Sequence, residues 1–361
     1  MADVIRYGII GTGMMGCEHI RNIMEIDDAR VVAISDPDER SRGWGLLCSG
    51  EDPDLGVYPD HREMLERADI DVVLVASPNH THARVMADVF ATDKHVMLEK
   101  PMCTTIEDCR TVVQGAASHP GVVWVAMEYR YLTPAARFLR EIAEGRVGEL
   151  KMLSIREHRH PFLPKVGDWN RFNRNTGGTL VEKCCHFFDL MNLAIGAMPV
   201  RVYGSGGQDV NHLDELCDGE TPDILDNAYV IVDYQNGCRA HLDLCMFAES
   251  SRNEQELVAT GPGGKLECFI PEGTIRIGTR KFKDFKEIEV GPDERVRYQG
   301  FHHGASYLEH LDFLDAIRTG SPPRVTAWDG LLAVAVGIAA HRSIDEGRPV
   351  LLEELGLARE S

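Results

Sequence analysis

The stretch VIRYGIIGTGMMG, from Val4 to Gly16, decides the fold. An apolar segment that would fit a buried strand runs directly into Gly11–Gly16, which has the spacing G-x-G-x-x-G. A helical pattern follows to about Met24, and the next apolar segment, VVAIS, is followed by the acidic residue Asp36. The glycine spacing alone is a weak signal because glycine-rich turns are common. A strand, a glycine turn, a helix and a second strand that leads to an acid together predict a βαβ unit that binds a dinucleotide.

Each part of this motif has a chemical role in such a site. Glycines let the backbone approach a pyrophosphate, which binds at the positive N-terminus of the helix. Asp36 would accept hydrogen bonds from the adenosine ribose hydroxyls, and its charge would repel a 2′-phosphate, so we expect NAD rather than NADP. Arg40 and Arg42 follow closely and would weaken that preference if they reached the phosphate. The cofactor contacts expected here are Gly11, Thr12, Gly13, Met14, Met15, Gly16 and Asp36.

Outward from this unit, strands and helices alternate through the first third of the chain. Apolar strands are expected over 71–76, 95–101 and 121–127, and a helix is expected over 82–91. Nearly continuous apolar strands between helices are typical of a parallel sheet that is covered on both faces. The sequence therefore predicts an α/β domain in this part of the chain.

The pattern changes after about residue 128. One helix, 134–145, is followed by mostly alternating strands, among them a hairpin over 227–247 whose turn is Asn236-Gly237. Two helices close the chain. A length of 361 residues also favours two domains, and we place the boundary near residue 128.

Composition narrows the classes of partner. The formal net charge of -19 disfavours nucleic acid and anionic membrane surfaces. The first residues show no basic segment before a long apolar core, and the longest apolar run, Leu331–Ala340, is too short to span a bilayer. Ten scattered cysteines without a CxxC pair suit reduced thiols better than a disulfide framework. We therefore expect a cytoplasmic protein with no nucleic-acid or membrane partner.

Two further motifs reveal a resemblance to a known family. With GTGMMG, ASPNHTH (Ala76–His82) and EKP (Glu99–Pro101) in this order, the chain resembles the Gfo/Idh/MocA family, the relatives of glucose–fructose oxidoreductase and inositol dehydrogenase. MEYRYLTPAARFLREI and GGTLVEKCCHFFD match in kind and order, so the resemblance covers nearly the whole chain. It implies a Rossmann domain, residues 1–128, with a doubly wound parallel sheet. It also implies an α+β domain, residues 129–361, whose large open sheet is mixed, mainly antiparallel, and serves substrate binding and oligomerisation.

The resemblance also implies roles for individual residues. Lys100 of the EKP motif would be catalytic or would orient the substrate, and the peptide bond before Pro101 is often cis in the family. His186 would accept the proton of the substrate. Four residues before this histidine the family commonly has aspartate, whereas Glu182 stands here, which leaves open whether it contacts substrate or only orients His186. Pro78, Asn79 and Glu99 fall on positions that line the nicotinamide half of the cofactor, and Ser77, His82 and Lys100 are further expected cofactor contacts.

The segment TLVEKCCHFFDL, Thr179–Leu190, allows several interpretations. Its acids, lysine, adjacent cysteines and histidine would suit a metal site, a redox pair, a catalytic face or a buried helix. In a continuous helix Glu182, His186 and Asp189 would lie on one stripe, whereas the two cysteines would diverge by about 100° and could not easily hold one ion. The polar stripe and the family match favour catalysis by His186 over a satisfied core histidine. Asp189 could support the site or be structural.

The chemistry of alcohol oxidation matches these residues. It needs a hydride acceptor, which nicotinamide supplies, and a base that works near neutral pH, which suits His186. The Lys100 ammonium would stabilise the developing alkoxide. A hydroxyl-rich substrate also needs polar and aromatic contacts, and the segment 154–178 is rich in them, although each could equally be part of a solvated loop. The substrate-binding candidates are Arg156, His158, Asp168, Trp169 and Arg171, beside Lys100, Glu182 and His186.

The leading hypothesis is an NAD-dependent dehydrogenase that acts on a cyclitol, a sugar or an aminosugar. The alternatives are a glycosidase of the same fold that recycles its NAD and a non-catalytic NAD or sugar sensor. A metal enzyme that uses Glu182 and His186 lacks a credible third ligand in the sequence, so no metal is expected. We also expect a homo-oligomer, a dimer or, as we favour, a tetramer, because strands such as AYVIVDY offer two faces to cover.

Overall fold

The computed structural model describes residues 4–357, which form two compact units. The first unit runs to Glu128 and the second begins at Tyr129. Two later segments, Lys165–Trp169 and Glu294–Leu331, which the sequence assigned to the second domain, belong to the first unit. Over the described residues, no helix is long and apolar enough to cross a membrane.

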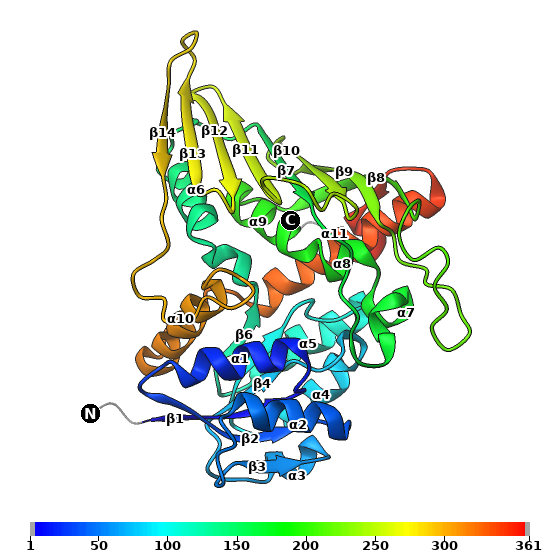
Figure 1. Ribbon diagram of the computed structural model, residues 1–361. Coiled ribbons are helices and arrows are strands. Elements are labelled where there is room, and N and C mark those ends of the chain that lie inside the picture. Colours follow the sequence, from blue (N-terminus) through cyan, green and yellow to red (C-terminus); the bar gives the residue numbers. More distant parts are fainter. Residues whose placement is uncertain (1–3, 358–361) are drawn as a thin grey trace. The chain divides into compact units, whose positions relative to one another are not determined.

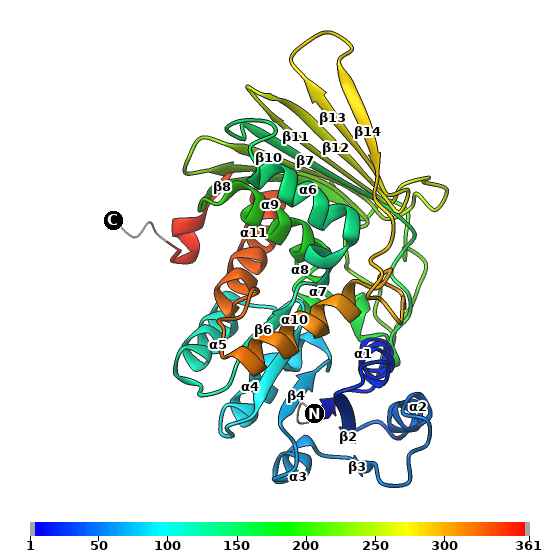
Figure 2. The ribbon, with the colours of Figure 1, turned by 90° about the vertical axis from the view of Figure 1, so that its left-hand side faces the viewer.

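A six-stranded parallel sheet with helices packed on it forms the first unit. The strands are β1 (Ile5–Ile10), β2 (Ala29–Ser35), β3 (Gly56–Tyr58), β4 (Val72–Val75), β5 (His95–Glu99) and β6 (Val123–Ala126). The helices are α1 (Met14–Met24), α2 (Glu39–Cys48), α3 (His61–Leu65), α4 (His82–Val89), α5 (Ile106–Ser118) and α10 (Ala305–Thr319). The strand order β3-β2-β1-β4-β5-β6 reverses beside β1, which confirms the doubly wound Rossmann sheet. Helix α1 contacts α2 and α10, and α4 contacts α5 (Figure 1, Figure 2).

Burial explains why this sheet forms and why α10 joins it. Strands β4 and β6 are buried at every position, as expected for a parallel strand that is covered on both faces. On α10, the ring of Phe313 lies against Trp124 of β6, with centroids 5.9 Å apart. The indole Nε1 of Trp124 donates a hydrogen bond to Glu309 Oε1 at 3.0 Å. A late segment of the sequence thus completes the core of the first unit.

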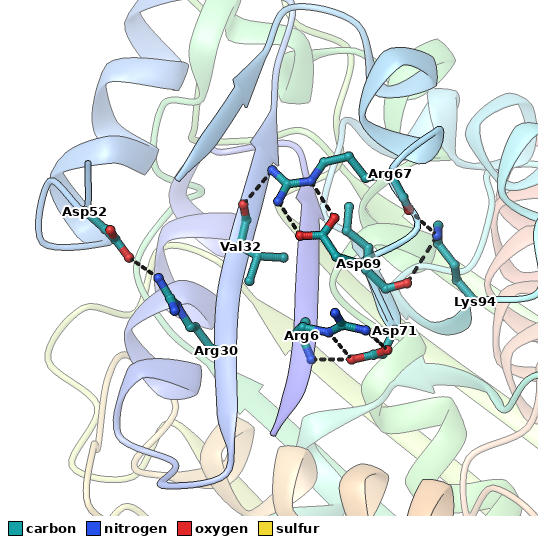
Figure 3. A network of polar contacts seen from close by, with 9 residues as sticks. Arg6, Arg30, Val32, Asp52, Arg67, Asp69, Asp71 and Lys94 are labelled. Carbon is teal, nitrogen blue, oxygen red and sulfur yellow. Dashed lines mark hydrogen bonds and ion pairs between the residues drawn. The ribbon is translucent and has the colours of Figure 1, made fainter. Parts of the chain in front are cut away.

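Charged side chains form hydrogen bonds at the amino ends of the strands of this sheet, the end opposite the glycine turn (Figure 3). The Arg6 guanidinium, at the start of β1, donates two hydrogen bonds to the Asp71 carboxylate, at 2.9 and 2.8 Å. Lys94 Nζ donates to the backbone carbonyls of Arg67 and Ile70 at 2.8 and 3.1 Å. Because partly exposed ion pairs contribute little to stability, the main effect of these contacts is to fix the loops that precede β4 and β5.

A nine-stranded sheet with helices on one face forms the second unit. The strands are β7 (Met152–His158), β8 (Pro199–Gly207), β9 (Asn227–Tyr234), β10 (Arg239–Cys245), β11 (Gln255–Gly261), β12 (Gly264–Ile270), β13 (Thr274–Thr279), β14 (Phe285–Glu289) and β15 (Val350–Leu351). The helices are α6 (Thr133–Ala143), α7 (Asn173–Thr176), α8 (Thr179–Glu182), α9 (Cys185–Ile195) and, from Leu332 onward, α11 (Ala327–Glu346). The order is β14-β13-β12-β11-β7-β10-β9-β8-β15. All neighbours are antiparallel except β7 and β10, which confirms the mixed, mainly antiparallel sheet.

The two faces of this sheet have different surroundings. On β7, Leu153, Ile155 and Glu157 are buried, whereas Arg156 and His158 are only half-buried. Because successive side chains of a strand point to opposite faces, the two sets lie on opposite sides of the sheet. Helix α6 contacts β12 and β13, and α9 contacts α6, so the buried set faces the helices (Figure 1). Arg156 and His158 therefore lie on the face that is turned away from α9.

The expected single helix over residues 179–190 is broken. The segment forms α8 and α9, separated by two residues, and the Cys184 N–H donates to the Thr179 carbonyl at 3.4 Å, five residues earlier. This turn is wider than an α-helical turn. The prediction that Glu182 and His186 lie on one stripe assumed a single regular helix, and that assumption is wrong. Every residue of the segment is buried, so its polar groups must find partners inside the protein.

A buried histidine caps the helix that carries Glu182. The Leu180 N–H donates to Nε2 of His341 at 3.1 Å, while the N-cap residue, Gly178, has no side chain to do so. A Cβ on Gly178 would lie 2.2 Å from His341 Nε2, and its φ of +90 also favours glycine. Only neutral imidazole can accept this hydrogen bond, and burial lowers the pKa of His341 to about 4.

Acid should therefore remove part of the stability of the protein. The pKa of histidine is about 6.5 in an unfolded chain and that of His341 is about 4 here, so the unfolded state binds a proton that the folded state does not. The free energy of unfolding should fall by about 3 kcal/mol between neutral pH and the folded-state pKa. His341→Gln keeps an acceptor that does not titrate, so urea unfolding should show a smaller loss in this variant. Equal losses in the two proteins would contradict the assignment.

Candidate active site

The turn after β1 holds strand, loop and helix in close contact. Gly11 has a φ of +90, and a Cβ there would lie 2.6 Å from the Ala76 carbonyl. A Cβ on Gly16 would lie 2.0 Å from the Gly11 carbonyl oxygen. Any larger residue would push the elements apart. By contrast, a Cβ on Gly13 would meet no described atom within 4 Å, so a ligand can approach the backbone at that point.

The N-terminus of α1 is suited to a pyrophosphate. Its N-cap, Gly13, makes no side-chain capping hydrogen bond, and the first turn contains no acidic residue. Met14 and Met15 are partly exposed at the first helical positions. Amides without intrahelical partners and the helix dipole attract an anion at such an end. The turn and the start of α1 therefore fit the phosphates of a dinucleotide.

The carboxylate of Asp36 is fixed where a ribose would lie in this type of site. Its Oδ2 accepts a hydrogen bond from the Thr12 N–H at 2.8 Å, and its Oδ1 accepts one from the Asp38 N–H at 2.9 Å. Burial raises the pKa of the Asp36 carboxyl, and these two donors oppose that shift. Each carboxylate oxygen has a second lone pair, so Asp36 can also accept from ribose hydroxyls.

The two arginines after Asp36 have contacts within the protein. Arg42 Nη1 donates to the backbone carbonyls of Asp36 and Pro37 at 2.7 and 3.0 Å. The guanidinium of Arg40 lies over the ring of Trp44, 4.9 Å from its centroid. Both side chains would have to give up these contacts to bind a 2′-phosphate.

His82 ties together the loops at the carboxyl ends of β4 and β5. Its Nε2 lies 2.9 Å from the Ser77 carbonyl oxygen, and its Nδ1 lies 3.0 Å from the Pro101 carbonyl oxygen. The ring is fully buried, and burial lowers its pKa. Both ring nitrogens thus face the backbone, and these contacts order the two loops.

The EKP turn presents Lys100 at the carboxyl end of β5. The Lys100–Pro101 peptide bond is cis, as the resemblance implied. The backbone N–H of Lys100 donates to Glu99 Oε2 at 2.8 Å, and the side chain is half-buried. At the end of the neighbouring strand, buried Asn79 has a side-chain nitrogen without a hydrogen-bond partner among the described residues. Ligands of open α/β sheets bind at the carboxyl ends of the strands.

A chain of buried side chains leads from the EKP turn into the first unit. Glu99 Oε1 lies 2.7 Å from His19 Nε2, and His19 Nδ1 lies 2.9 Å from His310 Nε2. A carboxylate only accepts hydrogen bonds, so His19 donates to it from Nε2. Burial raises the pKa of Glu99, but the hydrogen bond from His19 and the charges of His19, Lys100 and His302 together outweigh it, so the pKa lies below its usual value. Glu99 therefore stays anionic and holds the backbone of Lys100.

In the second unit, His186 is stacked on an aromatic ring whose hydroxyl accepts a hydrogen bond from a buried lysine. The imidazole and the ring of Tyr129 are parallel within 8°, with centroids 4.1 Å apart. Lys183 Nζ donates to the Tyr129 hydroxyl at 2.7 Å and lies 2.9 Å from Glu157 Oε1. Burial lowers the pKa of Lys183, and the charge of Glu157 opposes that shift. All four side chains are buried.

Sequence reasoning missed Tyr129, Lys183 and Glu157 as parts of this site. The available signal was the lysine inside the apolar segment 179–190, because a buried lysine requires a buried partner. Asp189 is paired with an arginine. It receives two hydrogen bonds from the Arg130 guanidinium, at 2.6 and 2.5 Å.

Two substrate-binding candidates, Arg156 and His158, point away from His186. Arg156 Nη2 lies 2.5 Å from Glu256 Oε1, and His158 Nε2 lies 3.0 Å from Asp243 Oδ1. These pairs occupy the sheet face opposite the helices. The structure thus does not bring either residue to the side of the sheet where His186 lies.

The remaining candidates fall in different units. Asp168 and Trp169 belong to the first unit, where the Trp169 ring lies 6.3 Å from that of His80. Arg171 belongs to the second unit and is buried, with Nε 3.2 Å from Glu215 Oε2. Its Nη1 and the side-chain oxygen of the preceding residue, Asn170, have no hydrogen-bond partner among the described residues. Sequence reasoning missed Asn170, which offers an acceptor of the kind that hydroxyl groups need.

Residues 4–357 show no metal centre: no group of three histidine, cysteine, aspartate or glutamate side chains there could hold an ion. Cys184 and Cys185 are both buried, and none of the ten cysteines forms a disulfide. The first unit thus carries a dinucleotide turn and the EKP lysine, and the second unit carries a stacked histidine. A doubly wound sheet with this glycine turn and the acid after its second strand is typical of an NAD-binding oxidoreductase.

Comparison with known proteins gives the family. The family described as "Oxidoreductase family, NAD-binding Rossmann fold" matches residues 5–127, and the one described as "Oxidoreductase family, C-terminal alpha/beta domain" matches residues 140–352. The chain therefore belongs to the Gfo/Idh/MocA family of oxidoreductases.

Similar proteins cover the chain almost completely. Myo-inositol 2-dehydrogenase of Thermotoga maritima is 28% identical over 356 residues, which are 97% of this chain and 99% of that protein. The scyllo-inositol 2-dehydrogenase (NAD(+)) of Bacillus subtilis is 25% identical and covers 98% of both chains. The structure of levoglucosan dehydrogenase in complex with NADH and levoglucosan has a TM-score of 0.84 at 20% identity, over 97% of this chain and 100% of that one. This last likeness concerns the fold.

Removing His19 from its buried pair with Glu99 should destabilise the protein far more than removing one member of an exposed ion pair. His19→Ala leaves the buried Glu99 carboxylate without its main donor, and breaking a buried pair from one side costs about 3–5 kcal/mol. The matched control is Arg30→Ala, which breaks a pair with Asp52 at 3.0 Å on the surface and should leave the urea midpoint nearly unchanged. Adding Glu99→Gln to His19→Ala should recover part of the loss. If both single variants unfold at the wild-type midpoint, the Glu99–His19 pair does not carry this role.

Proposed function

We propose that this chain is an NAD-dependent dehydrogenase that oxidises a secondary alcohol of a cyclitol, a sugar or an aminosugar. The observation that carries the proposal is the buried imidazole of His186, fixed against Tyr129 in a chain that also has a dinucleotide turn. The buried polar atoms of Asn170 and Arg171 support a hydroxyl-rich substrate. Relatives named inositol 2-dehydrogenase support the same substrate class.

In the proposed reaction, His186 is the base. Neutral imidazole accepts the proton of the substrate hydroxyl as the carbon loses its hydride. The Lys100 ammonium stabilises the negative charge that develops on the oxygen. Bound NAD supplies the hydride acceptor. Glu182, buried in α8, either contacts the substrate or orients His186.

The cofactor preference follows from charge. Asp36 has its carboxylate anchored by two backbone donors, so a 2′-phosphate would meet a fixed negative charge. Arg40 and Arg42 are engaged with Trp44 and with backbone carbonyls. We therefore favour NAD over NADP.

We further propose a homotetramer. Tyr203, Tyr229 and Ile231 on β8 and β9 are 44%, 60% and 46% exposed, and exposed apolar groups that gather on a sheet mark contact surfaces. Light scattering at micromolar concentration should give the tetramer mass. Ile231→Lys places a charge in this face and should lower the mass. A wild-type monomer would contradict the proposal.

Replacing Asp36 should weaken the discrimination between the two cofactors. Asp36→Ala removes both the ribose acceptor and the charge that repels a 2′-phosphate, so NAD affinity should fall and NADP affinity should rise. Asp38→Ala is the matched control, because it removes a neighbouring exposed carboxylate. Fluorescence titration with both reduced cofactors measures the effect. Wild-type protein that binds NADPH as tightly as NADH would refute the role of Asp36.

Replacing His186 should stop proton transfer without preventing cofactor binding. His186→Ala should lower kcat by about 10²–10⁴ while NAD affinity stays near the wild-type value. In the wild type, the rate should rise with pH as the imidazole loses its proton, and this limb should disappear in the variant. The assay measures NAD reduction with a panel of inositols, hexoses, glycosides and aminosugars. Net accumulation of NADH would also exclude a glycosidase that recycles its NAD.

Lys100 provides the complementary test. Lys100→Met keeps much of the length but removes the charge, so kcat should fall sharply, and the loss in the double variant with His186→Ala should be less than additive. If Lys100 were the base, the pH limb would vanish in Lys100→Met and remain in His186→Ala. That result would reverse the proposed roles.

A further inference from the structure

We propose that Tyr129 and Lys183 are positioning residues for His186, and that the Tyr129 ring, anchored by the buried lysine, fixes the plane of the imidazole and stabilises its protonated form. The inference rests on the proposed function, in which His186 accepts a proton. Neither residue was identified from the sequence, and both act through His186 rather than on the substrate.

The first step is the stack itself. The two rings are parallel within 8° at a centroid distance of 4.1 Å, and both residues are buried. A ring that covers one face of the imidazole prevents rotation about its side-chain bonds toward that side. Only the edges, which carry Nδ1 and Nε2, then remain for hydrogen bonding. A base must be within hydrogen-bond reach of its proton in a fixed orientation.

The second step is the anchor of the tyrosine. Lys183 Nζ donates to the Tyr129 hydroxyl at 2.7 Å and lies 4.8 Å from the centroid of its ring. The ammonium is held in turn by Glu157 Oε1 at 2.9 Å, and Gln255 Nε2 donates to Glu157 Oε2 at 2.8 Å. Glu157 and Gln255 belong to adjacent strands of the large sheet. The tyrosine is thus tied through Lys183 and Glu157 to the large sheet.

The third step is charge. The electron-rich face of an aromatic ring attracts a cation, so an imidazolium formed by proton uptake is favoured over Tyr129. Other charged groups near this cluster are largely paired: Lys183 with Glu157, and Arg130 with Asp189. The further charged groups on the packed elements are Glu182 on α8 and Arg159, 3.8 Å from Glu157. Since Tyr129 lies directly on the imidazole, its removal should affect His186 more than any change in the pairs.

The test uses three variants of the full-length protein. Tyr129→Leu removes the ring, Tyr129→Phe keeps the ring but loses the anchor, and Lys183→Met with Glu157→Gln removes the anchor without leaving a buried charge. Phe188→Leu is the matched control, because it removes a buried aromatic ring of α9, the helix that carries His186. The first readout is the NMR titration of His186 in substrate-free protein labelled with ¹³C at histidine Cε1. The His186→Ala variant assigns the resonance, because the signal of His186 is missing from its spectrum. The second is kcat and KM for the best substrate of the polyol panel.

The expected results separate ring from anchor. Tyr129→Leu should lower the titration midpoint of His186 by about 0.5–1 pH unit and lower kcat about tenfold, with KM less affected. Tyr129→Phe and the Lys183/Glu157 double variant should leave the midpoint near the wild-type value and lower kcat only a few-fold. Phe188→Leu should leave the midpoint unchanged even if it lowers stability.

Two outcomes would overturn the inference. One is a Tyr129→Leu midpoint equal to that of the wild type, and the other is an equal shift in Phe188→Leu. The proposed function fails differently, because His186→Ala would then keep the wild-type turnover and pH limb. The titration in substrate-free protein needs no turnover, so the two failures can be told apart.

Discussion

A charge that is buried in a protein must be compensated, and this requirement organises both units. In the first unit, Glu99 is buried behind the EKP turn and is held by His19 at 2.7 Å. In the second, Lys183 is buried and is held by Glu157 at 2.9 Å. Loss of one partner costs about 3–5 kcal/mol, a large part of the stability of an ordinary domain. Each pair fixes a segment that carries a proposed catalytic group: Lys100 follows Glu99, and His186 lies three residues after Lys183.

The two units differ in the kind of group on which their proposed roles depend. Cofactor binding depends mainly on backbone: the space left by Gly13, the close contacts at Gly11 and Gly16, and the amides at the start of α1. The proposed proton transfer depends on side chains that are stacked, paired and buried. A site made of backbone groups should tolerate substitution of nearby side chains as long as its glycines remain. A stacked histidine should be sensitive to substitution of each residue that orients it.

This difference explains which features the sequence could predict. The glycine turn, the acid after the second strand and the doubly wound sheet are local patterns, and the structure has the same sheet. The contact of Lys183 with Glu157 joins residues far apart in the chain, and no local pattern specifies it. The alternation along β7 could show that Arg156 and His158 share a face. The alternation could not show that the helices cover the opposite face of the sheet.

Long-range packing also limited the prediction of domains and helices. The contact between Trp124 and Phe313 places α10 in the first unit, and both residues look like ordinary core positions in the sequence. The segment that divides into α8 and α9 also has a buried partner far away in the sequence, His341, which accepts a hydrogen bond from the Leu180 amide. A helical periodicity of 3.6 residues cannot indicate such a break, because the apolar pattern continues through it.

The most direct test of the central claim follows the hydride. Wild-type protein is incubated with NAD and with myo-inositol that carries deuterium on its ring carbons, and the reduced cofactor is examined by mass spectrometry and NMR. If the protein is a dehydrogenase of such polyols, deuterium should appear at C4 of the nicotinamide, on one face only, together with an equal amount of the ketone. The same experiment can be repeated with deuterated hexoses and aminosugars. Ketone formed without deuterium in the cofactor, or no reduction of NAD by any of these polyols, would contradict the account.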